Sequence, residues 1–156
     1  YQFQSNWNSG KLNYYRLSEF KNSLTFSLKP NEFTIIKPGK LASVITIGPL
    51  LDYVIDALKD LDVEILYMNS IDSSKTLKFS PGNESQKLIT IEPYFPGFVT
   101  SQIQNHLPAK PYSFLNIGVD KKIIDRYGSK EKLLEYVGLD SMSIRKKVSS
   151  FLSDFD

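Results

Sequence analysis

The sequence predicts an α/β domain with a mostly parallel sheet, helices on both of its faces and one antiparallel edge strand. Two patterns indicate this fold class. Runs rich in β-branched residues alternate along the chain with segments whose apolar residues recur at helical spacing. Several runs are apolar throughout, as in strands that are buried on both faces. Strands and helices in alternation favour parallel pairing through right-handed crossovers.

The strands are predicted from short β-branched or aromatic runs that stop at turn residues. The run at 33–36 is followed by Lys37-Pro38-Gly39-Lys40, a turn signal that suggests a hairpin and an antiparallel edge strand. A buried strand at 42–47 ends at Gly48-Pro49. The remaining predicted strands are 63–68, 87–92, 112–117 and, upstream of the sheet, a short one at 14–17.

The helices are predicted from a change of period between these strands. Over 50–61 apolar residues take one helical face and acidic residues the other. A second helix lies between the fourth and fifth sheet strands, and two short helices finish the chain. The predicted boundary residues are Pro96-Gly97 and Pro108 for the second helix, Ser129 and Gly138 around a helix at 130–137, and Asp140 or Ser141 before the last.

The composition excludes several kinds of active site. The chain has no cysteine and a single histidine, His106. Disulfide frameworks, thiolate nucleophiles, cysteine zinc sites and histidine-cluster metal sites are therefore excluded. GxSxG, GxGxxG and P-loop motifs do not occur. The first strand-to-helix turn holds one glycine, Gly48, followed by a proline that lacks an N–H donor, so this turn does not indicate nucleotide binding.

The charge pattern indicates neither nucleic acid nor membrane as a partner. The 19 basic and 17 acidic residues give a net charge of +2 and are mixed along the chain. The densest basic cluster, Arg145-Lys146-Lys147, is interpreted as a solvated helix face, with a phosphate-binding patch as the alternative. No apolar run approaches the ~20 residues of a membrane span. The first residues lack the order of a signal peptide, so we expect a cytoplasmic location.

Glu92 is the candidate site residue that the pattern itself indicates. It ends the predicted strand at 87–92, and ligands of open α/β sheets gather beyond the carboxyl ends of strands. The alternative is a capping or solvated carboxylate beside the Pro93 turn. His106 lies near the end of a predicted helix, which favours a structural or surface role. Arg16 lies in an extended segment, where a salt bridge or an edge-strand position is the alternative to binding an anion.

Three stretches of sequence occur in an order found in a known family. PGKLASVITIG (38–48) and KLITIEP (87–93) are followed by the segment 112–152, in which a strand ends at Gly118, a turn follows at Gly128-Ser129 and a "GLd" turn at Gly138-Leu139-Asp140. Together they resemble the C-terminal region of 1-deoxy-xylulose-5-phosphate synthases and, more loosely, of transketolases. NYYRLSEF (13–20) resembles the "avRyPrg" end of the preceding pyrimidine-binding domain. The resemblance covers nearly the whole chain.

The resemblance implies a three-layer, five-stranded C-terminal domain over 31–156, with 1–30 as the tail of the pyrimidine-binding domain or a linker. It implies a non-catalytic assembly domain of a thiamine-diphosphate-dependent enzyme that transfers a two-carbon unit between sugar phosphates or related ketones. Thiamine diphosphate and Mg would be held by the N-terminal and middle domains of the same enzyme or of a partner subunit, and by no residue of this chain. A homodimer is expected.

One residue acquires a role through the resemblance. Arg16 matches the first arginine of the family's "vRyPR", which contacts the phosphate group of the substrate. The second arginine of that motif is Glu19 here, and the family's "KPLD" reads as the sequence at 72–75, DSSK. Glu92 stands in place of the first residue of the family's "EE" pair, as a possible residue of the site rim.

Two alternatives remain open. The chain is also similar in its implied fold to the corresponding domain of a 2-oxoacid dehydrogenase or oxidoreductase, although the "GLd" turn favours the sugar-processing enzymes. The other alternative is a stand-alone interaction module that has lost catalysis, which the departures at Glu19 and 72–75 favour. Fold similarity alone does not establish function.

Overall fold

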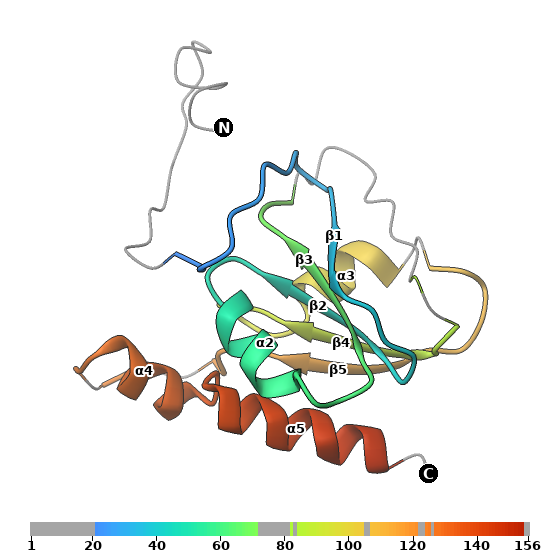
Figure 1. Ribbon diagram of the computed structural model, residues 1–156. Helices are drawn as coiled ribbons and strands as arrows, with labels where there is room; N and C mark the ends of the chain where they lie inside the picture. The colour runs from blue at the N-terminus through green and yellow to red at the C-terminus, as the bar shows by residue number, and fades with distance from the viewer. Residues whose placement is uncertain are drawn as a thin grey trace.

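The computed structural model describes residues 21–71, 82, 84–104, 107–121, 124–125 and 127–154 (Figure 1). Strands and helices alternate through most of this part of the chain, and two helices close it. The elements are β1 (Thr34–Lys37), β2 (Ser43–Ile47), α2 (Leu51–Leu58), β3 (Glu64–Met68), β4 (Lys87–Ile91), α3 (Phe98–Ile103), β5 (Ser113–Ile117), α4 (Lys130–Val137) and α5 (Ser141–Ser153). None of these helices combines the length and the apolar character that crossing a bilayer requires.

The five strands form one mixed sheet in the order β1-β3-β2-β4-β5. Parallel pairing joins β3 to β2, β2 to β4 and β4 to β5, whereas β1 runs antiparallel to β3 at one edge. The predicted fold class, including its antiparallel edge strand, is therefore confirmed. The hairpin suggested by the turn at 37–40 is wrong, because β1 pairs with β3 and not with β2, the strand that follows it. Each predicted sheet strand agrees with the observed one to within one residue at either end.

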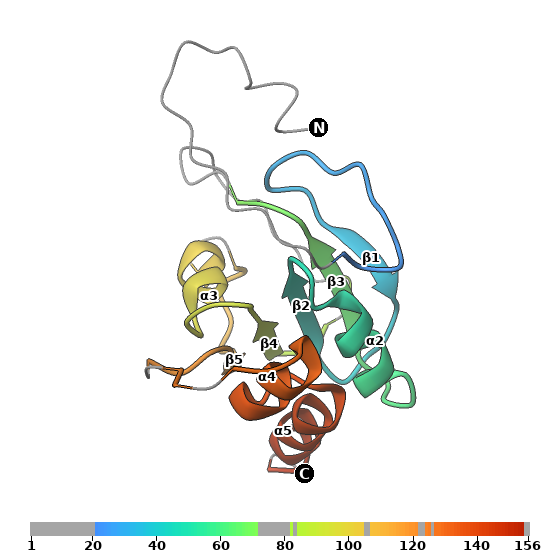
Figure 2. The ribbon, with the colours of Figure 1, turned by 90° about the vertical axis from the view of Figure 1, so that its left-hand side faces the viewer.

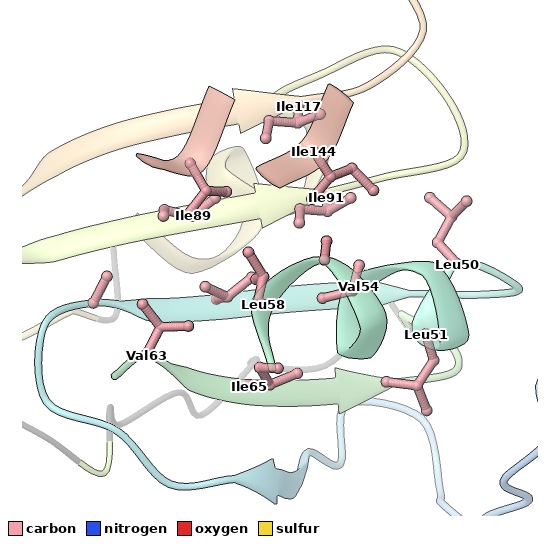
Figure 3. Close-up of a cluster of buried hydrophobic side chains, with 14 of the residues drawn as sticks. Leu50, Leu51, Val54, Leu58, Val63, Ile65, Ile89, Ile91, Ile117 and Ile144 are labelled. Carbon is pink, nitrogen blue, oxygen red and sulfur yellow. The ribbon is translucent and has the colours of Figure 1, made fainter. Parts of the chain in front are cut away.

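Helices cover both faces of the sheet, which gives three layers. Figure 2 shows α3 on one face and α2, α4 and α5 on the other. Successive side chains of a strand point to opposite faces, so each central strand serves two cores. On β2, Val44 belongs to the core under α2 and α5, and Ile45 to the smaller core under α3. Figure 3 shows the larger core, where Val54 and Leu58 of α2 lie over the sheet.

Helix α4 begins and ends, and helix α5 begins, at residues that the sequence predicted. The Ser129 side chain accepts a hydrogen bond from the N–H of Lys132, and Gly138 ends α4 in the left-handed conformation at φ 70°. Of the two residues predicted to cap α5, Asp140 is the one that does so, since its carboxylate accepts from Met142 and Ser143 N–H groups. These local contacts explain why the helix boundaries were readable from sequence.

Helix α2 ends at Leu58, three residues earlier than the period over 50–61 suggested. The Lys37 amine at the end of β1 explains the early end. It donates hydrogen bonds to the carbonyl oxygens of Leu58 and Lys59, at 2.8 and 3.1 Å, and to that of Leu61. A cation at the C-terminus of a helix is also favoured by the helix dipole.

The segment 21–30 carries no helix or strand and lies against the sheet domain. Phe26 and Leu28 pack on the larger core. The Asn22 side chain donates to the Gly48 carbonyl oxygen at 3.0 Å, and Ser23 donates to the Asp52 carboxylate at 2.8 and 2.9 Å. The predicted boundary near residue 30 stays a prediction. The strand predicted at 14–17 lies outside the described residues.

Candidate functional site

The carboxyl ends of β2 and β4 meet where the order of the sheet reverses. From β2 the chain crosses to β3 on one side, and later returns to β4 on the other side of β2. Open α/β sheets bind ligands beyond the carboxyl ends of the strands at such a point. Two turns form it here, Gly48-Pro49 and Glu92-Pro93. They lie close together, since a Cβ at position 48 would be 3.5 Å from the Pro93 ring.

A mostly apolar hollow of about 250 Å³, here called the switch-point hollow, opens where the strand order reverses, between the two proline turns and α4. Among the described residues that line it, Lys130 alone is charged, and its amine lies 4.9 Å from the centre of the Tyr53 ring. The hollow is smaller than the roughly 300–1,000 Å³ of typical ligand pockets. It therefore suits an apolar group better than a phosphorylated sugar. Its lining residues are Pro49, Leu50, Pro93, Val119, Ile124, Lys130, Leu133, Leu134, Val137 and Leu139.

Glu92 lies at the same end of β4 and is completely buried. Its carboxylate accepts hydrogen bonds from the N–H groups of Gly97, at 2.9 Å, and Val99, at 3.0 Å. The Thr90 hydroxyl lies 3.1 Å from the same carboxylate. Glu92 thus supplies the first turn of α3 with the acceptor that this turn lacks, which is the capping geometry that the sequence allowed. Its place at the rim of a site stays a prediction.

Burial raises the pKa of the Glu92 carboxyl, and the hydrogen bonds from Val99, Gly97, Thr90 and Phe98 act in the opposite direction without outweighing it. Burial also raises the pKa of the Tyr94 phenol far above its usual range, with the Glu92 charge as a second cause. Tyr94 therefore stays protonated at neutral pH and does not act as a base.

A polar cluster continues from Glu92 across the α3 side of the sheet. The Thr100 hydroxyl donates to the Asn116 side-chain oxygen at 2.5 Å. The Thr90 hydroxyl, whose one hydrogen also faces the Glu92 carboxylate, lies 2.9 Å from the same oxygen. These bonds tie β4, α3 and β5 together beside the buried carboxylate. They satisfy polar groups that would otherwise be costly in a closed interior. The cluster is interpreted as structural, because its acceptors are occupied by groups of the same domain.

Gly118 allows the loop after β4 to lie directly on the end of β5. A Cβ at this position would come within 2.4 Å of the Tyr94 carbonyl oxygen and 2.8 Å of the Pro96 nitrogen. The Val119 N–H donates to the same Tyr94 oxygen at 2.8 Å, and the Glu92 N–H donates to the Ile117 oxygen at 2.9 Å. Sequence reasoning identified Gly118 only as the end of a strand and missed this close approach.

The described residues contain no group of three or more His, Asp or Glu side chains arranged to hold a metal ion. Arg16 and His106 lie outside the described residues. Among the predicted site residues, the structure therefore places Glu92 alone. The hollow was not predicted, because its lining comes from four separate segments. The paired turns Gly48-Pro49 and Glu92-Pro93 were the available signal.

Of the comparisons with known proteins, the one with solved structures agrees with this architecture. No protein-family model matches the chain. A curated relative, the "Uncharacterized 33.6 kDa protein in fasciation locus" of Rhodococcoides fascians, is 32% identical over 143 residues, covering 89% of this chain and 46% of that protein. A solved structure, "Split gene transketolase, inactive beta4 tetramer", superposes with a TM-score of 0.65 at 18% identity, covering 87% of this chain and 48% of that one. The chain thus has a transketolase-like α/β fold and spans about half the length of both proteins.

Proposed function

We propose that this chain is the C-terminal assembly domain of a thiamine-diphosphate-dependent, transketolase-like enzyme that transfers a two-carbon unit between sugar phosphates or related ketones. The observation that carries the proposal is the match of 87% of the chain to about half of a split-gene transketolase. The order of the three resembling stretches, at 38–48, 87–93 and 112–152, supports the same assignment. The chain would associate with the remaining domains, in the same polypeptide or in a partner subunit.

The described residues do not fit a thiamine diphosphate site. The switch-point hollow is lined by apolar side chains and one lysine. Its turn places a proline, which has no N–H donor, directly after Gly48. A diphosphate needs a row of backbone N–H groups or a metal ion. We therefore assign thiamine diphosphate and Mg²⁺ to the parts of the enzyme beyond this chain, where the thiamine ring supplies the carbanion chemistry.

Oligomeric assembly is part of the proposal. The matched split-gene protein is described as a tetramer, and we infer that this domain likewise contributes contacts between subunits, with a homodimer as the smallest assembly. Exposed aromatic and aliphatic side chains around the carboxyl end of the sheet offer surface for the other domains. They include Phe95, Phe98, Ile124 and Tyr127, which are 53, 45, 44 and 104% exposed.

The test uses the chain alone and the chain assembled with the rest of its enzyme, obtained by co-expressing the sequence that flanks it in the genome. We expect calorimetry to show Mg²⁺-dependent binding of thiamine diphosphate to the assembly and none to the chain alone. We also expect the assembly to transfer a two-carbon unit between sugar phosphates. Decarboxylation of a 2-oxoacid in place of that transfer supports the 2-oxoacid dehydrogenase alternative. Tight assembly without any cofactor binding supports the interaction module, and either result overturns the proposal.

A further inference from the structure

The two edges of the sheet differ in how they are protected from pairing with another chain. An exposed edge strand offers unpaired N–H and C=O groups, and proteins block it with short strands, bulges, lysine or proline. At one edge, β1 has four residues, a register shift between Ile35 and Lys37, and Pro38 directly after it. At the other edge, β5 keeps an unbroken register over Ser113–Ile117 and contains neither lysine nor proline.

The hydrogen bonds of β5 show which of its groups face outward. The Ser113 N–H donates to Gln86 at 2.8 Å, and the Ile117 carbonyl accepts from Glu92 at 2.9 Å. Alternate residues of a parallel strand bond to the same neighbour, so Ser113, Leu115 and Ile117 bond to β4. The N–H and C=O groups of Phe114 and Asn116 therefore point away from the sheet. In the described part of the chain, no strand lies beyond β5 (Figure 2).

Side chains beside this edge are also suited to a partner. The Phe114 ring is 38% exposed on the α3 side. On the opposite side, a groove of about 510 Å³ separates Leu115 from the exposed face of α5. Along α5 the groove is lined by Lys146, Lys147 and, near the C-terminus of the helix, Asp154. The Lys147 amine also donates to the Gly138 carbonyl oxygen at 3.1 Å. Opposite charges thus line one groove, about two helical turns apart along α5.

We propose that β5 pairs antiparallel with β5 of a second copy of this chain, so that the two sheets become one continuous sheet across a two-fold axis at Leu115. The two outward-facing residues flank Leu115 symmetrically. Phe114 of each copy then stands opposite Asn116 of the other, and each such pair exchanges both of its backbone hydrogen bonds. The two-fold axis also reverses α5, which brings Asp154 of one copy toward the lysines of the other. The edge is therefore self-complementary in hydrogen bonding and in charge.

Pairing through β5 would supply the contact for the assembly role proposed above. It rests on that proposed function only for the expectation that the chain associates. Its first test is the mass of the chain in solution, by sedimentation equilibrium. We expect a dimer of twice 17.8 kDa. Phe114→Lys should weaken the association about tenfold or more, because an apolar ring leaves the interface. Ile35→Lys on the protected edge, where the side chain is 58% exposed, is the matched control and should leave the association unchanged.

A disulfide test reports the register directly. The chain has no cysteine, so Leu115→Cys introduces a single thiol beside the two-fold axis. Residues in such a non-hydrogen-bonded pair have Cα atoms about 4.5 Å apart, which lies within the range that a disulfide spans. We expect covalent dimers of this variant on mild oxidation and none of Ile35→Cys. Thermal melting of each variant identifies those that fail to fold.

Each other outcome overturns the inference. A monomer at all concentrations excludes pairing between copies. If that monomer binds the remaining half of its enzyme and Phe114→Lys blocks this binding, the edge serves a different partner. A dimer that survives Phe114→Lys and is not cross-linked through residue 115 uses another surface. In that case the assembly role stands, and the thiamine diphosphate assays, which do not depend on β5, decide the proposed function separately.

Discussion

Glu92 combines complete burial with hydrogen bonds from two backbone N–H groups and one hydroxyl. The N–H donors favour its charged form, whereas the closed surroundings disfavour it more strongly, so its pKa is raised. Glu92 therefore stabilises the start of α3 through its hydrogen bonds, but ionisation of its buried carboxyl lowers the stability of the folded state. A surface carboxylate in the same turn would carry no such penalty.

The raised pKa of Glu92 predicts a pH-dependent stability. In the unfolded chain this group titrates near its ordinary pKa of 4.5. The folded state holds the proton more tightly, so the free energy of unfolding contributed by this group falls as the pH rises from 4.5 through the folded-state pKa. In urea denaturation from pH 4 to 8, the wild type should therefore lose stability relative to Glu92→Gln as the pH rises.

Comparing how the stability of the wild type and of Glu92→Gln changes with pH separates the effect of Glu92 from that of the other carboxyl groups. The amide of Glu92→Gln also faces a backbone N–H with a donor of its own, which should lower stability by about 1–3 kcal/mol at every pH. That offset does not change the slope. Glu135→Gln, at an exposed position of α4, is the control and should have the wild-type slope. A wild type that gains stability relative to Glu92→Gln as the pH rises would contradict the assignment.

At the scale of elements, the loop between β4 and α3 is held in place by its contact with the end of β5. The loop carries Glu92, Tyr94 and Gly97, and Gly97 adopts the left-handed conformation at φ 93° to begin α3. The hydrogen bond from the Val119 N–H to the Tyr94 carbonyl oxygen holds the loop against β5, and Gly118 leaves room for the loop backbone there. The geometry of the candidate site thus depends on packing between elements.

Gly118→Ala tests this dependence. Its methyl group would meet backbone atoms of Tyr94 and Pro96 at 2.4 and 2.8 Å, so the loop must move. We expect the free energy of unfolding to fall by about 1–3 kcal/mol, as for other overpacking changes, measured by urea denaturation. Gly128→Ala is the matched control, since its nearest neighbour is the flexible Lys132 side chain at 3.5 Å. Equal stability of the two variants would show that the loop does not rest on β5.

At the scale of the whole molecule, the chain is about half of each protein that it matches. Its two cores are closed by its own helices, one under α3 and one under α2, α4 and α5. The switch-point hollow, the exposed aromatic side chains and the β5 edge remain as surfaces for other domains or copies. The proposed activity therefore belongs to an assembly, and tests of activity require it.

Arg16 provides a prediction for the assembled enzyme. If its guanidinium contacts the substrate's phosphate, Arg16→Ala should raise the KM for the sugar phosphate by about 10–100-fold, the loss of one or two charge-assisted hydrogen bonds. The kcat should change little, because the reacting atoms are elsewhere. Lys21→Ala, which removes an exposed cation five positions further along the sequence, is the control for general loss of charge. An unchanged KM for Arg16→Ala in steady-state assays would remove Arg16 from the phosphate site.

The sequence by itself determined the elements, because their signals are local. The β-branched run before Gly48-Pro49 predicts β2, and the caps at Ser129 and Asp140 act within three residues of themselves. The fold class followed from the alternation of these elements. The turn after 33–36 indicated an antiparallel edge strand, but not that its partner is β3. None of these inferences required knowledge of contacts between distant residues.

Only the tertiary structure decided what surrounds each candidate residue. The sequence left Glu92 open as a site residue or as a capping carboxylate, and its burial depends on α3 folding back over the end of β4. The hollow beside Pro93 forms only where four separate segments meet. That β5 is an edge strand follows only from the complete strand order. Such features depend on contacts between residues far apart in the chain, and these contacts leave no periodic signal in a single sequence.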